Sequence, residues 1–386
     1  MTAPPRGFPE AEFVARTQAA HRLMAEAGLD ALLLTTEPEI RYYTGFLTRF
    51  WESPTRPWFV ILPIGKKPFA VIPSIGVPLM AQTWIDDIQS WSAPDYDDDG
   101  IGLLTATLRE VTPAKGRIGI ADRMESHVRM PLADLRRLEQ HLAPRQLVGD
   151  ADVTRRLRLC KSEAEIDKIR HAVGIGNRAF DRVPEIAAVG TPLSEVFRAF
   201  QRLCLEEGAD TVPYLAGAAA NGGYIDVISP ATDAPLEHGD VLMLDTGLVW
   251  DGYFCDFDRN YSVGAASPVV VDCHARLVDA VMAAFEIAKP GAVIADLFHA
   301  MNAVVNPGGA VMDAGRLGHG LGMQLTEWPS IIPADHTVLK PGMVLTLEPS
   351  VETGEGKIMV HEENIVIGDN GAEFLSAPQS KPIRVI

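Results

Sequence analysis

The first 150 residues alternate between apolar positions at helical spacing and short, continuous apolar runs. Residues 10–27 have the period of an amphipathic helix, and residues 31–36 follow as a buried strand. Residues 59–74 predict two strands joined at GKK, and residues 117–142 predict a strand followed by a helix from about 124. Because helices and strands alternate, we predict one α/β domain over residues 1–155.

The pattern changes after a polar, Arg-rich passage at residues 149–161, which predicts a linker. Ser162 and Glu165 have capping-box spacing and open a helix. A second helix fits 194–207, and strand-rich sequence with helices near 268–288 and 293–304 follows. We predict a second, α+β domain over residues 156–386.

Length and charge narrow the class of protein. The 386 residues exceed the roughly 250–300 at which single cores stop growing, so two domains are expected. The sum of 34 Lys and Arg against 51 Asp and Glu gives a net charge of −17. Such a surface repels phosphates and anionic headgroups, which argues against nucleic acid and membrane surfaces as partners.

The cysteines and the apolar runs indicate the cellular compartment of the protein. The 4 cysteines are widely spaced without a CxxC pair, which predicts reduced thiols rather than a disulfide framework. The sequence contains neither a basic, apolar leader nor a long apolar run typical of a membrane span. We therefore expect a cytoplasmic protein.

Acidic residues gather on a predicted hairpin at residues 241–263. Two alternating runs flank Asp251-Gly252, a dipeptide that type I′ turns favour. Pairing across this turn sets 245 opposite 258 and 247 opposite 256. Asp245, Asp256 and Asp258 then share one face, where they repel one another unless a cation intervenes. The alternative is a solvated face of an antiparallel sheet.

Two further segments add metal-ligating side chains. Residues 342–367 predict a second hairpin around Glu355-Gly356, with Glu348 opposite Glu363 and His361 on the same side. Directly opposed like charges call for a compensating charge. His319 lies in GHGLG, where glycines allow the backbone to approach a crowded site.

These residues carry a family resemblance. Taken in order, Asp245, Asp256, His319 in GHGLG, Glu348 in LEP and Glu363 in EEN resemble the metal ligands of the pita-bread (M24) metallopeptidases. This family includes methionine aminopeptidase, aminopeptidase P, prolidase and creatinase. The length matches its two-domain members, which implies an α/β creatinase-like N-terminal domain followed by an α+β pita-bread catalytic domain.

The resemblance implies a dinuclear site. In the family pattern, Asp256 and Glu363 would bridge two metals, Asp245 would complete one shell, and His319 and Glu348 the other. Glu348 is the family's usual proton acceptor. Divalent cations of this kind lower the pKa of a shared water and polarise a carbonyl. Four carboxylates with one imidazole suit Mn²⁺, Co²⁺ or Fe²⁺ at least as well as Zn²⁺, and we expect manganese first.

The sequence departs from the family pattern on the substrate side. Ile228 and Ser229 stand where the proline-directed members have a first histidine, and Thr326 replaces a second in the HExP tetrad. His361 stands where an arginine is frequent. We expect Thr326 to line the substrate site and His361 to take over proton transfer. The alternative for His361 is a structural histidine hydrogen-bonded to a carboxylate.

The aromatic stretch Tyr42–Phe59 adds a candidate substrate contact. In two-domain relatives this region reaches the active site of a dimer partner, so the resemblance implies a homodimer. Trp51, Arg49 and Arg56 are then candidates for recognising a carboxylate on the substrate. The alternative is a surface loop packed on its own domain.

These expectations combine into a dinuclear metal-dependent hydrolase, most simply an Xaa-Pro dipeptidase or aminopeptidase acting on short peptides. Loss of both substrate-side histidines leaves open a reaction on a small compatible solute, by an ectoine-type amide hydrolase or a dimethylsulfoniopropionate lyase. A non-enzymatic binding module is the third possibility, against which the intact ligand types argue.

Overall fold

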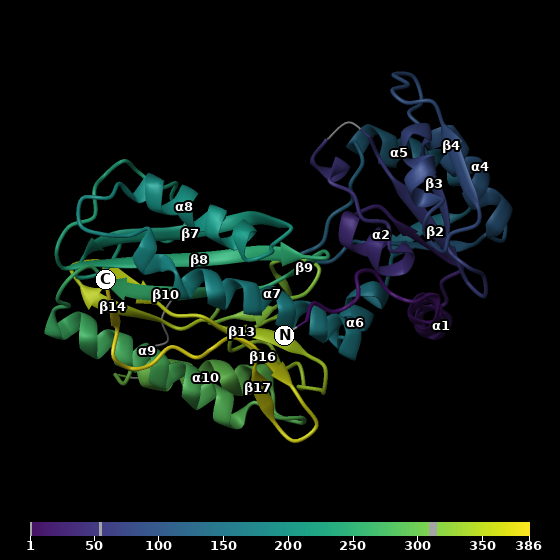
Figure 1. Ribbon diagram of the computed structural model, residues 1–386. Helices are drawn as coiled ribbons and strands as arrows, with labels where there is room; N and C mark the ends of the chain where they lie inside the picture. The colour runs from purple at the N-terminus through teal and green to yellow at the C-terminus, as the bar shows by residue number, and fades with distance from the viewer. Residues whose placement is uncertain (1, 54–55, 309–314) are drawn as a thin grey trace. The chain divides into compact units, whose positions relative to one another are not determined.

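The computed structural model describes residues 2–53, 56–308 and 315–386. The chain divides at Arg158 and Leu159 into two units, each with its own core (Figure 1). Among the described residues, no helix has the length and apolar character needed to cross a membrane.

The N-terminal unit is built on one mixed six-stranded sheet in the order β4-β3-β2-β1-β5-β6. Its elements are α1 (Glu10–Ala27), β1 (Ala31–Leu34), α2 (Glu37–Thr44), β2 (Phe59–Pro63), β3 (Phe69–Pro73), α3 (Val77–Met80), β4 (Ile88–Trp91), α4 (Ile101–Val111), β5 (Arg117–Ile120), α5 (Leu132–Leu142), β6 (Gln146–Gly149) and α6 (Val153–Leu159). Leucines of α4 and α5 pack on apolar residues of β1, β2, β3 and β5. The predicted α/β alternation is therefore confirmed.

Two predictions for this unit need correction. The helix expected from residue 124 begins only at Leu132, with Pro131 as its N-cap. Proline disfavours helical geometry in the residue before it, which explains why the helix starts after Pro131. The polar passage expected as a linker forms helix α6 over much of its length.

The second unit begins with the predicted capping box, in which Ser162 and Glu165 each accept from the other's backbone N–H. Its helices are α7 (Glu163–Asp181), α8 (Leu193–Glu206), α9 (Pro268–Ile287) and α10 (Ile294–Val305). Its strands are β7 (Thr211–Asn221), β8 (Asp240–Trp250), β9 (Tyr253–Phe254), β10 (Phe257–Ser262), β11 (His319–Gly320), β12 (Glu327–Ser330), β13 (Val344–Leu347), β14 (Ser350–Gly354), β15 (Lys357–Val360), β16 (Glu363–Ile367), β17 (Ala372–Phe374) and β18 (Arg384–Val385).

These strands form two larger sheets, β18-β10-β8-β7 with β9 beside β8, and β12-β11-β13-β16-β17, together with the pair β14-β15. Helices α7 and α8 pack on β8 and β7, while α9 packs against β14 and β15 (Figure 1). Val241 and Met243 of β8 belong to one core with Leu345 of β13 and Leu277 of α9. Because side chains alternate along a strand, Asp245 lies on the same face as Val241 and Met243, which is the face of this core.

Candidate metal centre

The β8–β10 hairpin has the predicted register. Asp245 pairs directly with Asp258, and Trp250 pairs with Tyr253 across the turn. Asp251 and Gly252 both have positive φ, 46° and 77°, as a type I′ turn requires. Asp256 is 3% exposed and Asp258 1% exposed, so the alternative of a solvated face is wrong.

The second hairpin has its turn at the predicted place, but its register is shifted by one residue. Glu355 and Gly356 have positive φ, and Gly354 pairs with Lys357 as expected. A β-bulge between Glu352 and Gly354 then places an extra residue in the first strand, so that Leu347 pairs with Glu363. The predicted pairing of Glu348 with Glu363 is therefore wrong, and Glu362 is the residue in line with Glu348.

Among the described residues, Asp256, His319 and Glu362 form a group whose potential metal-ligand atoms lie within 4.8 Å of one another. All three side chains are buried. His319 Nε2 is 3.4 Å from Asp256 Oδ2, and its Nδ1 lies 2.8 Å from the Gly320 carbonyl. That contact makes Nδ1 the protonated nitrogen and leaves the Nε2 lone pair facing the carboxylates. Burial lowers the pKa of His319 to about 4, so the imidazole is neutral.

The carboxylates around this group repel one another. Burial and the neighbouring carboxylates raise the pKa values of Asp245, Asp256 and Glu362 well above the usual range. Burial raises the pKa of Glu348 to about 7, against the opposing charge of Arg316. Burial and the charge of the nearby Asp245 carboxylate also raise the pKa of the Tyr214 phenol.

Unpartnered oxygens give an independent test of whether this site fits cations. Among the described residues, Asp245 Oδ1, Asp258 Oδ2 and Glu362 Oε1 are buried without a hydrogen-bond donor. Buried polar oxygens normally accept hydrogen bonds, and a bound cation can satisfy those that have no donor. An imidazole lone pair among hard oxygen donors fits a divalent transition-metal ion.

Glu363 and His361 lie behind this cluster, in a network of their own. Glu363 pairs with Arg259 at 3.1 Å, accepts from the Gln379 N–H at 2.8 Å and also accepts from the Ser376 hydroxyl. Burial alone would raise the pKa of Glu363, but Arg259 and the other donors lower it overall. The structure thus brings Glu362, and not Glu363, to the cluster.

His361 is held between two carboxylates. Its Nδ1 lies 3.0 Å from Asp258 Oδ1, and its Nε2 lies 3.2 Å from Glu363 Oε1. Burial opposes the charged imidazolium, but Asp258 and Glu363 raise the pKa of His361 to about 9. Both ring nitrogens therefore face carboxylates, as in the structural alternative given above, and a role of His361 in proton transfer stays a prediction.

The expected substrate residues lie in different places. Thr326 accepts a hydrogen bond from Arg316 Nη2 at 3.1 Å, within the second unit. Ile228 is 83% exposed, in a loop where Asp226 accepts from the backbone and hydroxyl of Ser229. Among the described residues, the hydrogen bonds of Ile228 and Ser229 are made to Asp226 in the same loop.

The aromatic stretch of the N-terminal unit has local partners, and its residues 54–55 lie outside the described part of the chain. Trp51 packs on Trp58, with Arg129 stacked over its ring at 5.2 Å. Arg49 pairs with Glu52, and Arg56 lies over the Phe50 ring. These contacts account for the three residues within their own unit, and their role toward substrate stays a prediction.

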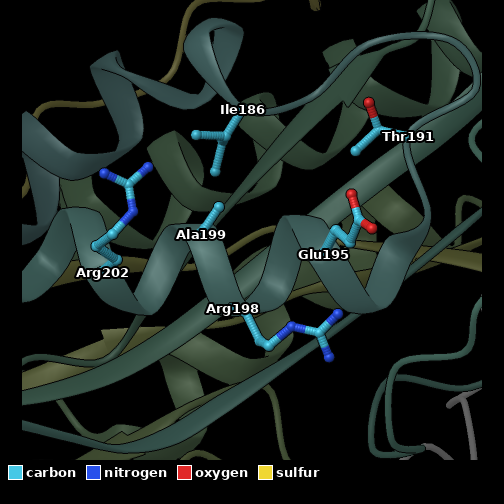
Figure 2. A pocket seen from close by; sticks show the side chains of 6 residues that line it. All are labelled: Ile186, Thr191, Glu195, Arg198, Ala199 and Arg202. Carbon is cyan, nitrogen blue, oxygen red and sulfur yellow. The ribbon is translucent and has the colours of Figure 1, made fainter.

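A separate hollow of about 490 Å³ lies along α8 and is lined by Ile186, Thr191, Glu195, Arg198, Ala199 and Arg202 (Figure 2). Its single carboxylate comes from Glu195, and Arg202 already pairs with Glu206. This hollow therefore lacks the set of acids that marks the cluster on the hairpins.

Two residues of the site were missed in the sequence. Glu362 is the neighbour of the predicted Glu363, and only the bulge decides between them. Arg316 lies three residues before His319, and nothing in its local sequence connects it with Thr326. The order of acids along the chain pointed to the site, but not to these details.

Models of two known protein families match the two parts of the chain. Residues 167–369 match the model of metallopeptidase family M24, and residues 16–160 match the creatinase/prolidase N-terminal domain. The chain belongs to metallopeptidase family M24. Its M24 match contains both hairpins and the His319 loop, so the family resemblance is confirmed. The chain is a hydrolase of a metal-dependent family, which excludes the non-enzymatic alternative.

Several named proteins are similar to this chain in sequence or structure over most of its length. A probable dipeptidase PepE of Mycobacterium bovis is 29% identical over 350 residues, covering 90% of this chain and 89% of the relative. An Xaa-Pro dipeptidase of Pyrococcus horikoshii is 30% identical over 236 residues, 60% of this chain and 66% of its own. The crystal structure of dipeptidase PepE from Mycobacterium ulcerans has a TM-score of 0.84 at 26% identity, with 98% of this chain and 99% of that one covered. The predicted fold class, a creatinase-like domain followed by a pita-bread domain, is confirmed.

Proposed function

We propose that this M24 hydrolase is a dinuclear metallopeptidase that cleaves Xaa-Pro dipeptides or similarly short peptides. The observation that carries the proposal is the set of buried carboxylates with unpartnered oxygens around His319. The peptide substrate is supported by the relatives, which are named as dipeptidases. These names do not favour the compatible-solute alternative.

We assign the metal ligands to Asp245, Asp256, His319, Glu348 and Glu362, with Glu362 taking the place first expected for Glu363. Two divalent ions, Mn²⁺ first and Co²⁺, Fe²⁺ or Zn²⁺ otherwise, would supply Lewis-acid activation of water and of the substrate carbonyl. Asp256, His319 and Glu362, whose ligand atoms lie together, would hold at least one of these ions.

The chain's own residues prepare this site in identifiable ways. The Gly320 carbonyl fixes the His319 tautomer, and Thr346 Oγ1 accepts from the His319 N–H at 3.1 Å. Glu348 would accept a proton from water and return it to the leaving amine. In the metal-free protein, burial raises its pKa to about 7. His361 and Arg259 orient Asp258 and Glu363 behind the site.

The proposal also includes a homodimer and a cytoplasmic location, as two-domain relatives and the cysteine pattern suggest. In the N-terminal unit, Trp51, Arg49 and Arg56 stay candidates for substrate contact.

The test combines metal analysis with substrate profiling. Protein purified without chelator should contain about two transition-metal ions per chain and should release free proline from Xaa-Pro dipeptides. The Glu348→Gln variant should lose turnover and part of its metal, because it removes both a ligand carboxylate and the proton acceptor. Turnover confined to small cyclic amides or sulfonium compounds would overturn the peptidase assignment, and protein that binds no transition metal would overturn the dinuclear centre.

A further inference from the structure

Arg316 is a half-buried arginine beside the metal centre, and most of its guanidinium N–H groups have no acceptor among the described residues. Within the described part of the chain its guanidinium makes one hydrogen bond, to Thr326 Oγ1 at 3.1 Å, and no carboxylate lies within ion-pairing distance of it. Guanidinium groups in partly buried positions of acidic proteins usually pair with carboxylates. A cation without a carboxylate partner among the described residues, in a chain of net charge −17, therefore points to an anionic ligand.

The backbone fixes Arg316 next to the proposed ligands. The carbonyl of Leu317, the following residue, accepts from the Glu348 N–H at 3.0 Å, and the Leu317 N–H donates to Ile331. The Arg316 charge acts on Asp256 and Glu348, lowering the pKa of each against the effect of burial. The guanidinium thus lies within electrostatic reach of the metal centre.

The position of Thr326 is fixed by the contacts of its neighbour in the chain. The next residue, Glu327, is buried and pairs with Lys161 at 3.0 Å. Its other oxygen accepts from the backbone N–H groups of Met323 and Gln324. These contacts hold the 322–327 loop in place. The Thr326 hydroxyl can therefore orient the Arg316 guanidinium.

We infer that Arg316, oriented by Thr326, forms a subsite that binds the free carboxylate of the substrate. The guanidinium fork matches a carboxylate with two parallel hydrogen bonds, whereas a neutral amide can accept only weakly in the same geometry. This inference rests on the proposed function, because it names the group of a short peptide that the site recognises. It makes this chain a dipeptidase in preference to an aminopeptidase of longer peptides, whose carboxylate lies far from the scissile bond.

The test compares a dipeptide with its C-terminal amide, which has the same shape without the charge. Wild-type enzyme loaded with Mn²⁺ should prefer Ala-Pro over Ala-Pro amide in kcat/KM. Arg316→Gln should lose roughly 30- to 100-fold in kcat/KM on the dipeptide, mainly through KM, and change little on the amide. Arg316→Lys should recover only part of the loss, because it keeps the charge but lacks the fork.

Arg198→Gln is the matched control. Arg198 is exposed on α8, where it lines the separate hollow (Figure 2), so this variant should behave as wild type. Metal content and thermal unfolding of Arg316→Gln should equal those of the wild type, which separates a binding role from a folding role. An equal loss on dipeptide and amide would overturn the carboxylate subsite.

The inference and the proposed function fail in different ways. If the wild type cleaves neither peptide, the peptidase proposal fails, and calorimetric binding of proline against prolinamide to the Mn²⁺-loaded protein decides the subsite. Preferential binding of proline, lost in Arg316→Gln, would support it. Equal binding of both compounds, or no change in the variant, would overturn it.

Discussion

Asp245 and Asp258 face each other directly across the β8–β10 hairpin, and each has a buried oxygen without a hydrogen-bond donor among the described residues. Directly opposed carboxylates destabilise a sheet. Burial is the main cause of the raised pKa values of both carboxyl groups, which shows that their charged forms are destabilised at this place. The sequence around them therefore favours metal binding at the expense of the stability of the metal-free protein.

Removing the metal should lower the thermal stability of the catalytic domain. A ligand that binds only the folded state at 100 times its Kd stabilises that state by about 2.7 kcal/mol. We expect the midpoint of thermal unfolding to fall in EDTA and to recover when excess Mn²⁺ is added. Calorimetry measures this shift, and Asp256→Asn should abolish it. A midpoint that does not respond to Mn²⁺ in the wild type would contradict the metal centre.

The bulge in the second hairpin predicts opposite effects for two neighbouring glutamates. Metal-free Glu362→Gln should be more stable than wild type by about 1–2 kcal/mol at pH 7, because it removes a carboxylate that burial and its neighbours oppose. Glu363→Gln should be less stable by roughly 3 kcal/mol, because Arg259 loses its buried partner.

Metal analysis completes that comparison. Glu362→Gln should lose bound metal, whereas Glu363→Gln should retain it if the domain stays folded. Urea unfolding with and without EDTA measures the stabilities, and elemental analysis counts the ions. Metal loss in Glu363→Gln alone would show that the register expected from the sequence governs ligation.

The two hairpins show what a sequence pattern can and cannot determine. The Asp251-Gly252 turn admits one tight geometry, so the alternation on either side fixes which acids face one another. Around Glu355-Gly356 the turn was also placed correctly, but the bulge after Glu352 depends on packing that alternation does not encode. One extra residue moved Glu363 away from the cluster and brought Glu362 into it.

Contacts between segments far apart in the chain could not be predicted from the sequence for a different reason. Pairs such as Arg316 with Thr326, or Lys161 with Glu327, form only after the strands assemble. His361 illustrates the same limit, because its neighbour Asp258 lies 103 residues away along the chain. Residue types and order predicted the class of site, while the tertiary fold decided which side chains face it.

A buried ion pair beneath the first turn should be essential to that hairpin. Lys168 of α7 pairs with Asp251, and both side chains are almost fully buried. Asp251→Asn tolerates the same backbone conformation but leaves the lysine without its carboxylate, so we expect a loss of about 3–5 kcal/mol in unfolding free energy. The double variant Asp251→Asn with Lys168→Met should recover most of that loss. Urea unfolding of the three variants provides the measurement, and additive losses would contradict the coupling.

Asp150 gives a pH dependence that is independent of the metal centre. Burial raises its pKa from 3.8 to about 6, although the Asp152 N–H donates to it at 3.0 Å. A carboxyl whose folded pKa is raised stabilises the fold below its unfolded pKa and loses that contribution as pH rises through the folded value. The wild-type N-terminal unit should therefore lose roughly 2–3 kcal/mol from this group between pH 3.8 and 6.

Asp150→Asn removes that titration while its side-chain oxygen can still accept from the Asp152 N–H. The variant and the wild type should have equal unfolding free energies near pH 3.5. Their difference should then grow in favour of the variant up to about pH 6.5 and stay constant above it. Denaturant unfolding of the N-terminal unit across this range measures the difference, with Asp97→Asn, an exposed aspartate of the same unit, as the control for surface charge. A difference that is independent of pH would mean that Asp150 has the same pKa in the folded and unfolded states, as expected if water reaches its carboxylate in the folded protein.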